Sequence, residues 1–566
     1  MSTAIHSAST PSVDGLPTAA ATLVASLAAH GTDRVFCVAG ESYLPVLDAL
    51  YDHTGIDLVT CRHEGSAAFA ALADGKLTRR PGICLVSRGP GATNAAIGVH
   101  AAAEDASPLI LLVGGVSSTK TGREAFQDID CAQLFGGIAK AVFNLAEPSM
   151  TGELLARAFR IAVGGTPGAV VLTLPEDILY HADTVGVLTE LPTLATTALA
   201  SQDLDKVRDL LAAARRPLLL AGAQVDSPRG RKLIMAAAER HSIPVITSNK
   251  NQHLLPNRHP AYAGHLHNAT QPAQLSALDD ADLVIAAGTR LDWVTTQGHR
   301  FPSGRMPRQA LVHVYPDAER IGRYHPPAVG MVANPVDFLR QLVSWDPADP
   351  TISRAAWLAR LHSIEAAKAV WRPVPDEDGI VFGEVVAALD ELTSGEVTVV
   401  VDSGTFTSWI YRYLRLGQRG RLLGLSSSAM GFAVGAGVSA ALRGSEVPIV
   451  VIIGDGGFLM NCGELATAAQ RQLPVVFVVA NNSSYATIRL HQEVKYPGRT
   501  IGTDLTNPDF AAMAKSFGLL GLTARTQDQV RPCLAKALGH HRPSVVEINT
   551  SLRHITAYRR LPPALQ

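Results

Sequence analysis

Short apolar runs alternate with longer segments of helical spacing along most of the chain. In the first third, helices are expected over residues 18–30, ended by Gly31, and over 45–51, and a third begins at Glu64. The apolar runs of this third predict strands at 34–39, 57–61, 83–87, 109–114 and 169–174. Strands that alternate with helices in this way are typical of βαβ units, in which the strands are parallel.

The same alternation occurs twice more. The apolar runs of the middle and last thirds predict strands at 217–221, 244–247, 283–287, 311–314, 397–401, 447–453, 474–479 and 544–548. Stretches of low order at 185–197 and 345–349 separate the three blocks. We therefore predict the α/β class, with three doubly wound parallel-sheet domains in series. Their limits are expected at 17–184, 198–344 and 360–550, between a flexible tail at 1–16 and a C-terminal tail at 551–566.

Composition narrows the class of protein. The 566 residues suffice for about three to four domains of roughly 150 residues each. Because 47% of the residues are hydrophobic, a disordered chain is excluded. The net charge of −1 is too small and of the wrong sign to attract nucleic acid or anionic membranes. No apolar run approaches the ~20 residues of a membrane helix. The 6 cysteines form no CxxC pair, and the chain start lacks signal-peptide features. We expect a cytoplasmic protein.

The most specific motif lies in the last third, where two predicted strands each end in small polar residues. Gly454-Asp455-Gly456-Gly457 follows one strand, and Asn481-Asn482 follows the next. A glycine-rich turn exposes backbone N–H groups to phosphate oxygens. Asp455, the amide of Asn482 and the carbonyl of Ser484 offer the oxygen ligands that Mg²⁺ prefers. Two ordinary turns, one Asp-Gly and one Asn-Asn, are the structural alternative.

The run from Gly454 to Asn482 matches the GDG…NN pattern of thiamine diphosphate enzymes. Over residues 15–550 the chain resembles the acetolactate synthase and 2-keto-acid decarboxylase group of that family. The resemblance implies three domains, in the order pyrimidine-binding, central and diphosphate-binding. It also implies thiamine diphosphate and Mg²⁺ as cofactors, and a homodimer or homotetramer whose active sites are shared between two subunits.

The resemblance also implies roles for individual residues. Glu64, in His63-Glu64-Gly65, corresponds to the carboxylate that hydrogen-bonds N1′ of the cofactor's aminopyrimidine; a glutamate stabilised by the helix dipole is the alternative. Met430 corresponds to the residue that holds the cofactor bent, so that its two rings approach each other. The other expected cofactor contacts are Pro90 and Asn94, in a turn over 89–94, and Gly404, Thr405, Ser428, Gly454, Asp455, Gly456, Gly457, Asn482 and Ser484. Of these, Asp455, Asn482 and Ser484 are the expected metal ligands.

Three further residues are expected near the substrate as catalytic candidates. Gln127 belongs to a Phe-Gln pair that the family has close to its substrate, and an interdomain contact is the alternative. Glu41 adds a carboxylate as a candidate acid or base, unless it is a solvated loop residue. His491 replaces the tryptophan of acetolactate synthases and could hydrogen-bond a polar acceptor, unless it lies at the surface.

Two departures concern the flavin that acetolactate synthases commonly contain. Val294 stands where the family has an arginine for the substrate carboxylate and the flavin. The family's GMHG-like flavin segment is replaced by Gly264-His265-Leu266-His267-Asn268. We therefore do not expect FAD, nor 2-ketobutyrate as a substrate.

The resemblance implies an acetolactate synthase-like carboligase. The cofactor ylide would add to a 2-keto acid such as pyruvate, CO₂ would leave, and the acyl-anion equivalent would be transferred to a second carbonyl. The alternative is a 2-keto-acid decarboxylase or C–C lyase that releases an aldehyde, because the motifs are common to both. A non-catalytic relative is disfavoured by the presence of Glu64, Asp455 and Asn482. A CoA-dependent acyl lyase would need a nucleotide site, for which the basic candidates are Arg215, Arg216, Arg229, Arg231 and Lys232.

Overall fold

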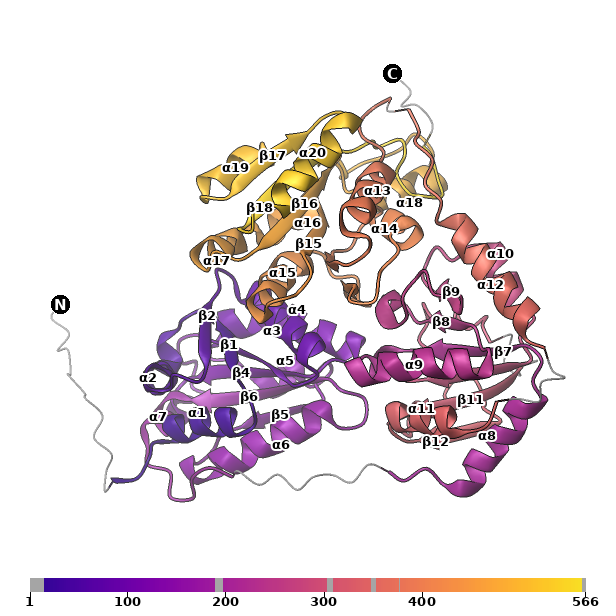
Figure 1. Ribbon diagram of the computed structural model, residues 1–566. Coiled ribbons are helices and arrows are strands. Elements are labelled where there is room, and N and C mark those ends of the chain that lie inside the picture. The colour runs from indigo at the N-terminus through magenta and orange to yellow at the C-terminus, as the bar shows by residue number, and fades with distance from the viewer. Residues whose placement is uncertain (1–14, 189–196, 303–308, 348–352, 376, 562–566) are drawn as a thin grey trace. The chain divides into compact units, whose positions relative to one another are not determined.

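The computed structural model describes residues 15–188, 197–302, 309–347, 353–375 and 377–561. Three six-stranded sheets occur in this part of the chain, and the strands within each sheet are all parallel (Figure 1). In each sheet the first strand of the chain is an inner strand, and later strands are added on both of its sides. The prediction of three doubly wound α/β domains is therefore confirmed.

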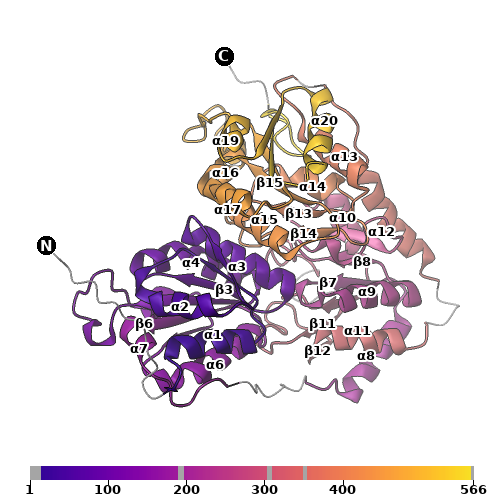
Figure 2. The ribbon, with the colours of Figure 1, turned by 60° about the vertical axis from the view of Figure 1, so that its left-hand side comes forward.

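The first sheet lies in the N-terminal third. Its strands are β1 (Arg34–Cys37), β2 (Asp57–Thr60), β3 (Gly82–Val86), β4 (Leu109–Gly115), β5 (Ala141–Asn144) and β6 (Ala169–Pro175), in the order β2-β1-β3-β4-β6-β5. One face is covered by α1 (Ala19–Ala29), α2 (Leu44–Asp52) and α6 (Thr151–Val163), and the other by α3 (Glu64–Thr78) and α4 (Gly89–Asp105) (Figures 1 and 2). Helix α1 begins as predicted, because Oγ1 of Thr18 accepts the N–H of Ala21 at 3.2 Å.

The other two sheets follow along the chain. The second consists of β7 (Pro217–Ala221), β8 (Val245–Thr247), β9 (Tyr262–His265), β10 (Leu283–Ala287), β11 (Ala310–Tyr315) and β12 (Val329–Val332), ordered β12-β11-β10-β7-β8-β9. The third consists of β13 (Thr398–Val401), β14 (Arg421–Leu423), β15 (Ile449–Gly454), β16 (Val475–Asn481), β17 (Leu520–Ala524) and β18 (Ser544–Asn549), ordered β14-β13-β15-β16-β18-β17. Helices α13 (Phe382–Thr393) and α20 (Gln527–Leu538) pack together on one face of the third sheet.

Five strands differ from the prediction in that the apolar pattern does not reveal them: β5, β9, β12, β14 and β17. Each is an edge strand of its sheet. An edge strand has one neighbour, so it needs fewer apolar residues and leaves a weaker signal, as in β12, where buried and exposed positions alternate. The segment 89–94, predicted as a turn, is instead the start of α4. Strand β16 runs on to Asn481, because Asn481 pairs with Asn549 of β18.

Parts of the predicted tails and linkers lie outside the described residues, namely 1–14, 189–196, 348–349 and 562–566. Residues 551–561 of the predicted C-terminal tail are described, and Ile555 and Ala557 within them are buried. None of the helices in the described ranges is both long enough and apolar enough to cross a membrane.

The chain forms two compact units. The first contains the first sheet together with Val434–Arg443 and Asn461–Arg471, and the second contains the other two sheets. Most of α15 (Phe432–Arg443) and all of α17 (Leu465–Gln470) therefore belong to the first unit, although both connect strands of the third sheet. Gly435 permits the close packing of α15 on α3, because a Cβ there would come within 2.7 Å of the Ser66 carbonyl oxygen.

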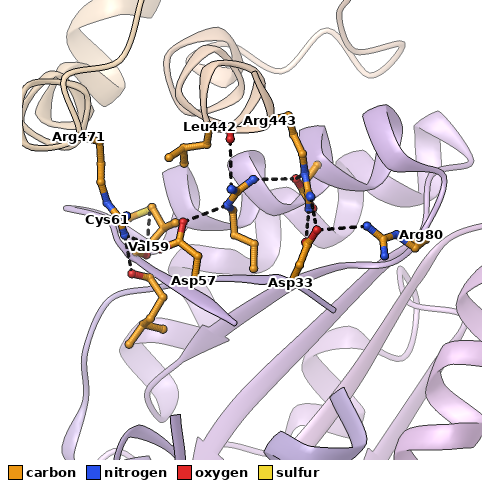
Figure 3. A network of polar contacts seen from close by, with 11 residues as sticks. Asp33, Asp57, Val59, Cys61, Arg80, Leu442, Arg443 and Arg471 are labelled. Carbon is orange, nitrogen blue, oxygen red and sulfur yellow. Dashed lines mark hydrogen bonds and ion pairs between the residues drawn. The ribbon is translucent and has the colours of Figure 1, made fainter. Parts of the chain in front are cut away.

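An ion-pair network holds α15 on the first sheet (Figure 3). The Arg443 guanidinium donates to both oxygens of Asp33, at 2.6 and 2.7 Å, and to both oxygens of Asp74, at 2.5 and 2.6 Å. Hydrogen bonding to Arg443 lowers the pKa of Asp33. Arg471 makes a second link, from just beyond α17 to Asp57 of β2, at 2.8 Å. These links are charge-assisted and bidentate at Arg443, the strongest class of hydrogen bond between side chains.

We expect Arg443→Ala to destabilise the first unit strongly. The substitution leaves Asp74, whose side chain is 5% exposed, without its main partner. Loss of one member of such a buried pair costs about 3 kcal/mol of unfolding free energy. The melting temperature of the purified protein measures the effect. Lys206→Ala is the control, since it removes an ion pair to Asp203 whose two side chains are 54% and 36% exposed. Equal melting temperatures for the two variants would contradict the assignment.

Candidate active site

A cavity of about 260 Å³ lies in the second unit, at the carboxyl ends of β13, β15 and β16. Parallel strands bring these ends to one edge of the sheet, where ligands of such folds bind. All the residues predicted for the diphosphate and metal side line this cavity: Gly404, Thr405, Ser428, Met430, Gly454, Asp455, Gly456, Gly457, Asn482 and Ser484. The third sheet thus brings together side chains from four separate stretches of sequence.

The two glycines after β15 lie in crowded surroundings, and Gly456 leaves no room for a side chain. Helix α16 (Asp455–Asn461) begins directly after the strand, in the motif singled out from the sequence. A Cβ at Gly456 would lie 2.4 Å from Cε1 of Tyr485, and one at Gly457 would lie 3.2 Å from Oδ1 of Asp402. Any other residue at Gly456 would therefore displace the Tyr485 ring from the cavity wall.

Asp455 is the carboxylate at the centre of the predicted metal site. Its Oδ1 accepts the N–H of Gly456 at 2.9 Å, and its Oδ2 accepts Nδ2 of Asn507 at 2.8 Å. Burial raises the pKa of Asp455, and these hydrogen bonds oppose the rise. Asn507 also donates to Asn481, at 2.9 Å, and so joins Asp455 to β16. No sequence motif marks Asn507; only its position in space reveals it.

The donor set of the predicted metal site is mixed. The Oδ1 of Asn482 accepts the N–H of Ser484 at 3.2 Å, and the Ser484 carbonyl accepts the N–H of Ala486 at 2.8 Å. A carbonyl oxygen has a second lone pair, which leaves Ser484 able to bind a cation. Among the described residues, no group of three or more His, Cys, Asp or Glu side chains could hold a metal. One carboxylate with amide and carbonyl oxygens suits Mg²⁺, which takes its other ligands from phosphate and water.

Asp402 lies beneath the cavity and shapes its wall. The residue is 1% exposed, and its carboxylate accepts the N–H groups of Ser403, Gly431 and Ala433 at 2.7, 3.1 and 3.0 Å. Burial raises the pKa of Asp402 to about 6, and the three N–H groups oppose the rise. Asp402 therefore holds the loop of Ser428 and Met430 against the end of β13. It follows an apolar strand, a signal that the sequence carries, but its partners are distant in the chain.

Three buried polar atoms on the cavity wall have no hydrogen-bond partner among the described residues: Oγ of Ser484, Oγ1 of Thr550 and Nε2 of His554. Their position on the cavity wall lets a polar ligand in the cavity pair with these three atoms. Thr550, Ser551 and His554 come from the stretch after β18, which is not a predicted part of the site. Phe382 and Trp409 add apolar wall that the sequence motifs also do not reveal.

The pyrimidine-side residues lie in the first unit. Glu64 is the first residue of α3, and its Oε2 accepts Nδ2 of Asn94 at 2.9 Å. A Cβ on Gly91 would lie 3.5 Å from Oε1 of Glu64. Gly91 and Asn94, in the first turns of α4, therefore lie beside the Glu64 carboxylate, and Pro90 belongs to the same helix start. Glu64 is half-buried.

Glu41 and Gln127 are both connected to the segment between β3 and α4. Glu41 is exposed and forms an ion pair with Arg88, at 3.0 Å, and Arg88 also pairs with Glu176, at 3.1 Å. Gln127 has φ +62°, a conformation uncommon for a residue with a side chain, and its carbonyl accepts the N–H of Gly89 at 3.0 Å. Arg88 and Gln127 line a cavity of about 400 Å³. Arg88 precedes the 89–94 motif, and sequence reasoning overlooked it.

The structure does not bring His491 to the cavity wall. His491 is exposed on α18 (Ala486–Lys495), about one turn beyond Thr487 and Ile488, which do line the cavity. In the segment compared with the flavin-binding one, His265 and His267 are buried and stacked with ring centroids 4.6 Å apart. Burial lowers the pKa of His267 to about 3, so its ring is neutral.

Comparison with known proteins agrees with this geometry. Three family models of thiamine pyrophosphate enzymes match the chain: the N-terminal TPP binding domain over residues 17–134, the central domain over 204–342, and the C-terminal TPP binding domain over 402–548. The acetolactate synthase large subunit of Parasynechococcus marenigrum is 30% identical, over 96% of this chain and 89% of the relative. The acetolactate synthase of Mycobacterium bovis is 31% identical, over 91% and 84%.

A putative thiamine pyrophosphate-containing protein of Bacillus subtilis is 27% identical, over 92% of this chain and 89% of the relative. The chain belongs to the thiamine diphosphate-dependent enzymes, and within them to the acetolactate synthase type. The resemblance found in the sequence is therefore confirmed.

Asp402 predicts a pH dependence of stability. Because its pKa is raised in the folded state, the protonated form stabilises the fold below the ordinary pKa near 4, and this contribution is lost as the pH rises through about 6. The stability advantage of wild type over Asp402→Asn should therefore shrink by about 2 kcal/mol between about pH 4 and pH 7. Melting temperatures across this range measure it. Asp205→Asn, at an exposed site, should show no such trend; a parallel pair of curves for wild type and Asp402→Asn would contradict the assignment.

Proposed function

We propose that this enzyme depends on thiamine diphosphate and Mg²⁺, decarboxylates a 2-keto acid, and transfers the remaining acyl unit to a second carbonyl compound. The observation that carries the proposal is the single cavity lined by all the predicted diphosphate-side and metal-side residues. The printed names of relatives that match nearly the whole chain support an acetolactate synthase-like reaction.

The residues present fit this cofactor. Asp455, Asn482 and Ser484 supply oxygen ligands for Mg²⁺, and the unpartnered atoms of Ser484 and Thr550 offer hydrogen-bonding groups to phosphate oxygens. Met430 would support the cofactor between its two rings. When bound, thiamine diphosphate supplies a nucleophilic carbon and accepts the electron pair released by decarboxylation.

Glu64 would exchange a proton with N1′ of the cofactor's aminopyrimidine. The hydrogen bond from Asn94 fixes the Glu64 side chain through one oxygen, and the other oxygen remains available to the ring. Glu64 and the cavity belong to different units of the chain. We therefore propose, as the family resemblance implies, a homodimer or homotetramer in which Glu64 and the cavity of one active site come from different subunits.

Carboligation is preferred to simple decarboxylation because relatives that match nearly the whole chain are named acetolactate synthase. Release of an aldehyde needs a proton donor at the reacting carbon, and Glu41 and His491 are the candidates. Glu41 is engaged with Arg88, and His491 is exposed on α18. Neither side chain lines the cavity, and the relatives named acetolactate synthase favour transfer to a second carbonyl. A 2-keto-acid decarboxylase or C–C lyase is the alternative that the test must distinguish.

Product analysis distinguishes these reactions. The purified enzyme is incubated with Mg²⁺, thiamine diphosphate and pyruvate, and the products are identified by chromatography and mass spectrometry. Acetolactate is the product expected of a carboligase, and acetaldehyde that of a decarboxylase. If CO₂ is released from neither pyruvate nor bulkier 2-keto acids, the proposed reaction is wrong.

Replacement of Glu64 tests the catalytic assignment. Glu64→Gln keeps an acceptor for Asn94 but cannot exchange a proton with N1′, so kcat should fall by about 100-fold or more. Binding of Mg²⁺ and thiamine diphosphate, measured by calorimetry, should remain detectable. Glu153→Gln, which alters an exposed carboxylate on α6, is the control. A variant with unchanged kcat would refute the role of Glu64.

A further inference from the structure

The cofactor cavity contains one basic side chain. Of the described residues that line it, Asp455 has the sole carboxylate and His554 the sole side chain that can carry a positive charge. A diphosphate group bears several negative charges, which Mg²⁺ offsets only in part. Each oxygen that leaves water therefore needs a hydrogen-bond donor from the protein. His554 is thus placed where such a donor is needed.

The segment that carries His554 is fixed in position. The N–H of Ser551 donates to the carbonyl of Ile380, at 2.9 Å, and the N–H of Ala557 donates to Oγ of Ser408, at 3.0 Å. Between these two points, the N–H of His554 donates to Oγ of Ser551 at 2.9 Å, and Ile555 is 2% exposed. Backbone contacts on both sides of His554 therefore hold its imidazole at the cavity wall.

One nitrogen of the His554 imidazole has no partner in the described part of the chain. Its Nε2 is buried and has no hydrogen-bond partner there. Burial lowers the pKa of His554, and the charge of Arg560 lowers it further, whereas Asp378 and Glu377 oppose the shift. The ring is therefore neutral near pH 7 and carries one N–H, which can be placed on Nε2.

The unpartnered state of Nε2 is costly unless a ligand relieves it. A buried polar atom without a partner costs about 1–3 kcal/mol. Oγ of Ser484 and Oγ1 of Thr550, on the same cavity wall, are also buried without a hydrogen-bond partner among the described residues. A ligand with several oxygen atoms offers partners to such groups, and the described residues supply none for these three atoms.

We propose that His554 is a binding residue for the coenzyme's diphosphate, with Nε2–H as the donor to a phosphate oxygen. The inference rests on the proposed function, since it assumes that the cavity takes a diphosphate. It assigns to the stretch after β18, which none of the family motifs covers, a direct part in retaining the coenzyme.

Calorimetric titration tests the inference with two probes, Mg²⁺–thiamine diphosphate and Mg²⁺–diphosphate without the thiamine part. For His554→Ala the dissociation constants of both probes should rise by about 10-fold to 100-fold, the usual range for a hydrogen bond to a charged group. His554→Gln retains an N–H donor and should lose less. Arg559→Ala is the matched control, because Arg559 is a basic residue of the same segment that does not line the cavity.

The outcomes separate the inference from the function on which it rests. If wild type binds neither probe, the proposed function fails and the role of His554 fails with it. If wild type binds both and His554→Ala binds them equally well, the role of His554 alone is refuted. An equal loss in Arg559→Ala would also refute it, by showing a general effect of charge. Circular dichroism and the melting temperature without ligand verify that each variant is folded, and His554→Gln carries the test if His554→Ala is not.

Discussion

The parallel pairing of β15 with β16 is the constraint on which the coenzyme side of the site depends. In this register Gly454 lies opposite Ala480. Asp455 comes directly after β15 and Asn482 directly after β16, so both side chains lie at the same edge of the sheet. A slip of one residue would turn every side chain of one strand to the opposite face and would separate the two metal-binding candidates.

Buried polar groups define the shape of the cavity as much as its apolar wall does. Asp402 gathers three backbone N–H groups, and Asn507 joins the carboxylate of Asp455 to the amide of Asn481. These interactions tie the loops to one another and to the strand ends. Among the described residues, Ser484, Thr550 and His554 each have an unpartnered buried atom and lie on the cavity wall. These three atoms therefore offer polar surface to a ligand in the cavity.

The first two residues of helix α15 belong to the second unit, and the rest of the helix belongs to the first. It begins at Phe432, directly after the loop of Ser428 and Met430, and ends at Arg443, which is bound by Asp33 and Asp74. Its packing on α3 depends on the absence of a side chain at Gly435. The residues that hold this helix are charged and glycine residues with no part in the chemistry. Their role is to keep the C-terminal end of α15 on the first sheet.

The sequence by itself determined the three-domain α/β organisation, the central strands and the coenzyme motifs. These depend on local apolar runs and on short spacings such as Gly454 to Gly457, which are visible without knowledge of distant contacts. Five of the six edge strands were seen only in the tertiary structure, as were the roles of Asn507, Arg88, Asp402 and His554. Their significance arises from partners far away in the chain, as when Asp402 meets Gly431 and Ala433. Local sequence encodes which residues are buried, but only the folded chain decides which buried polar groups meet and which are left for a ligand.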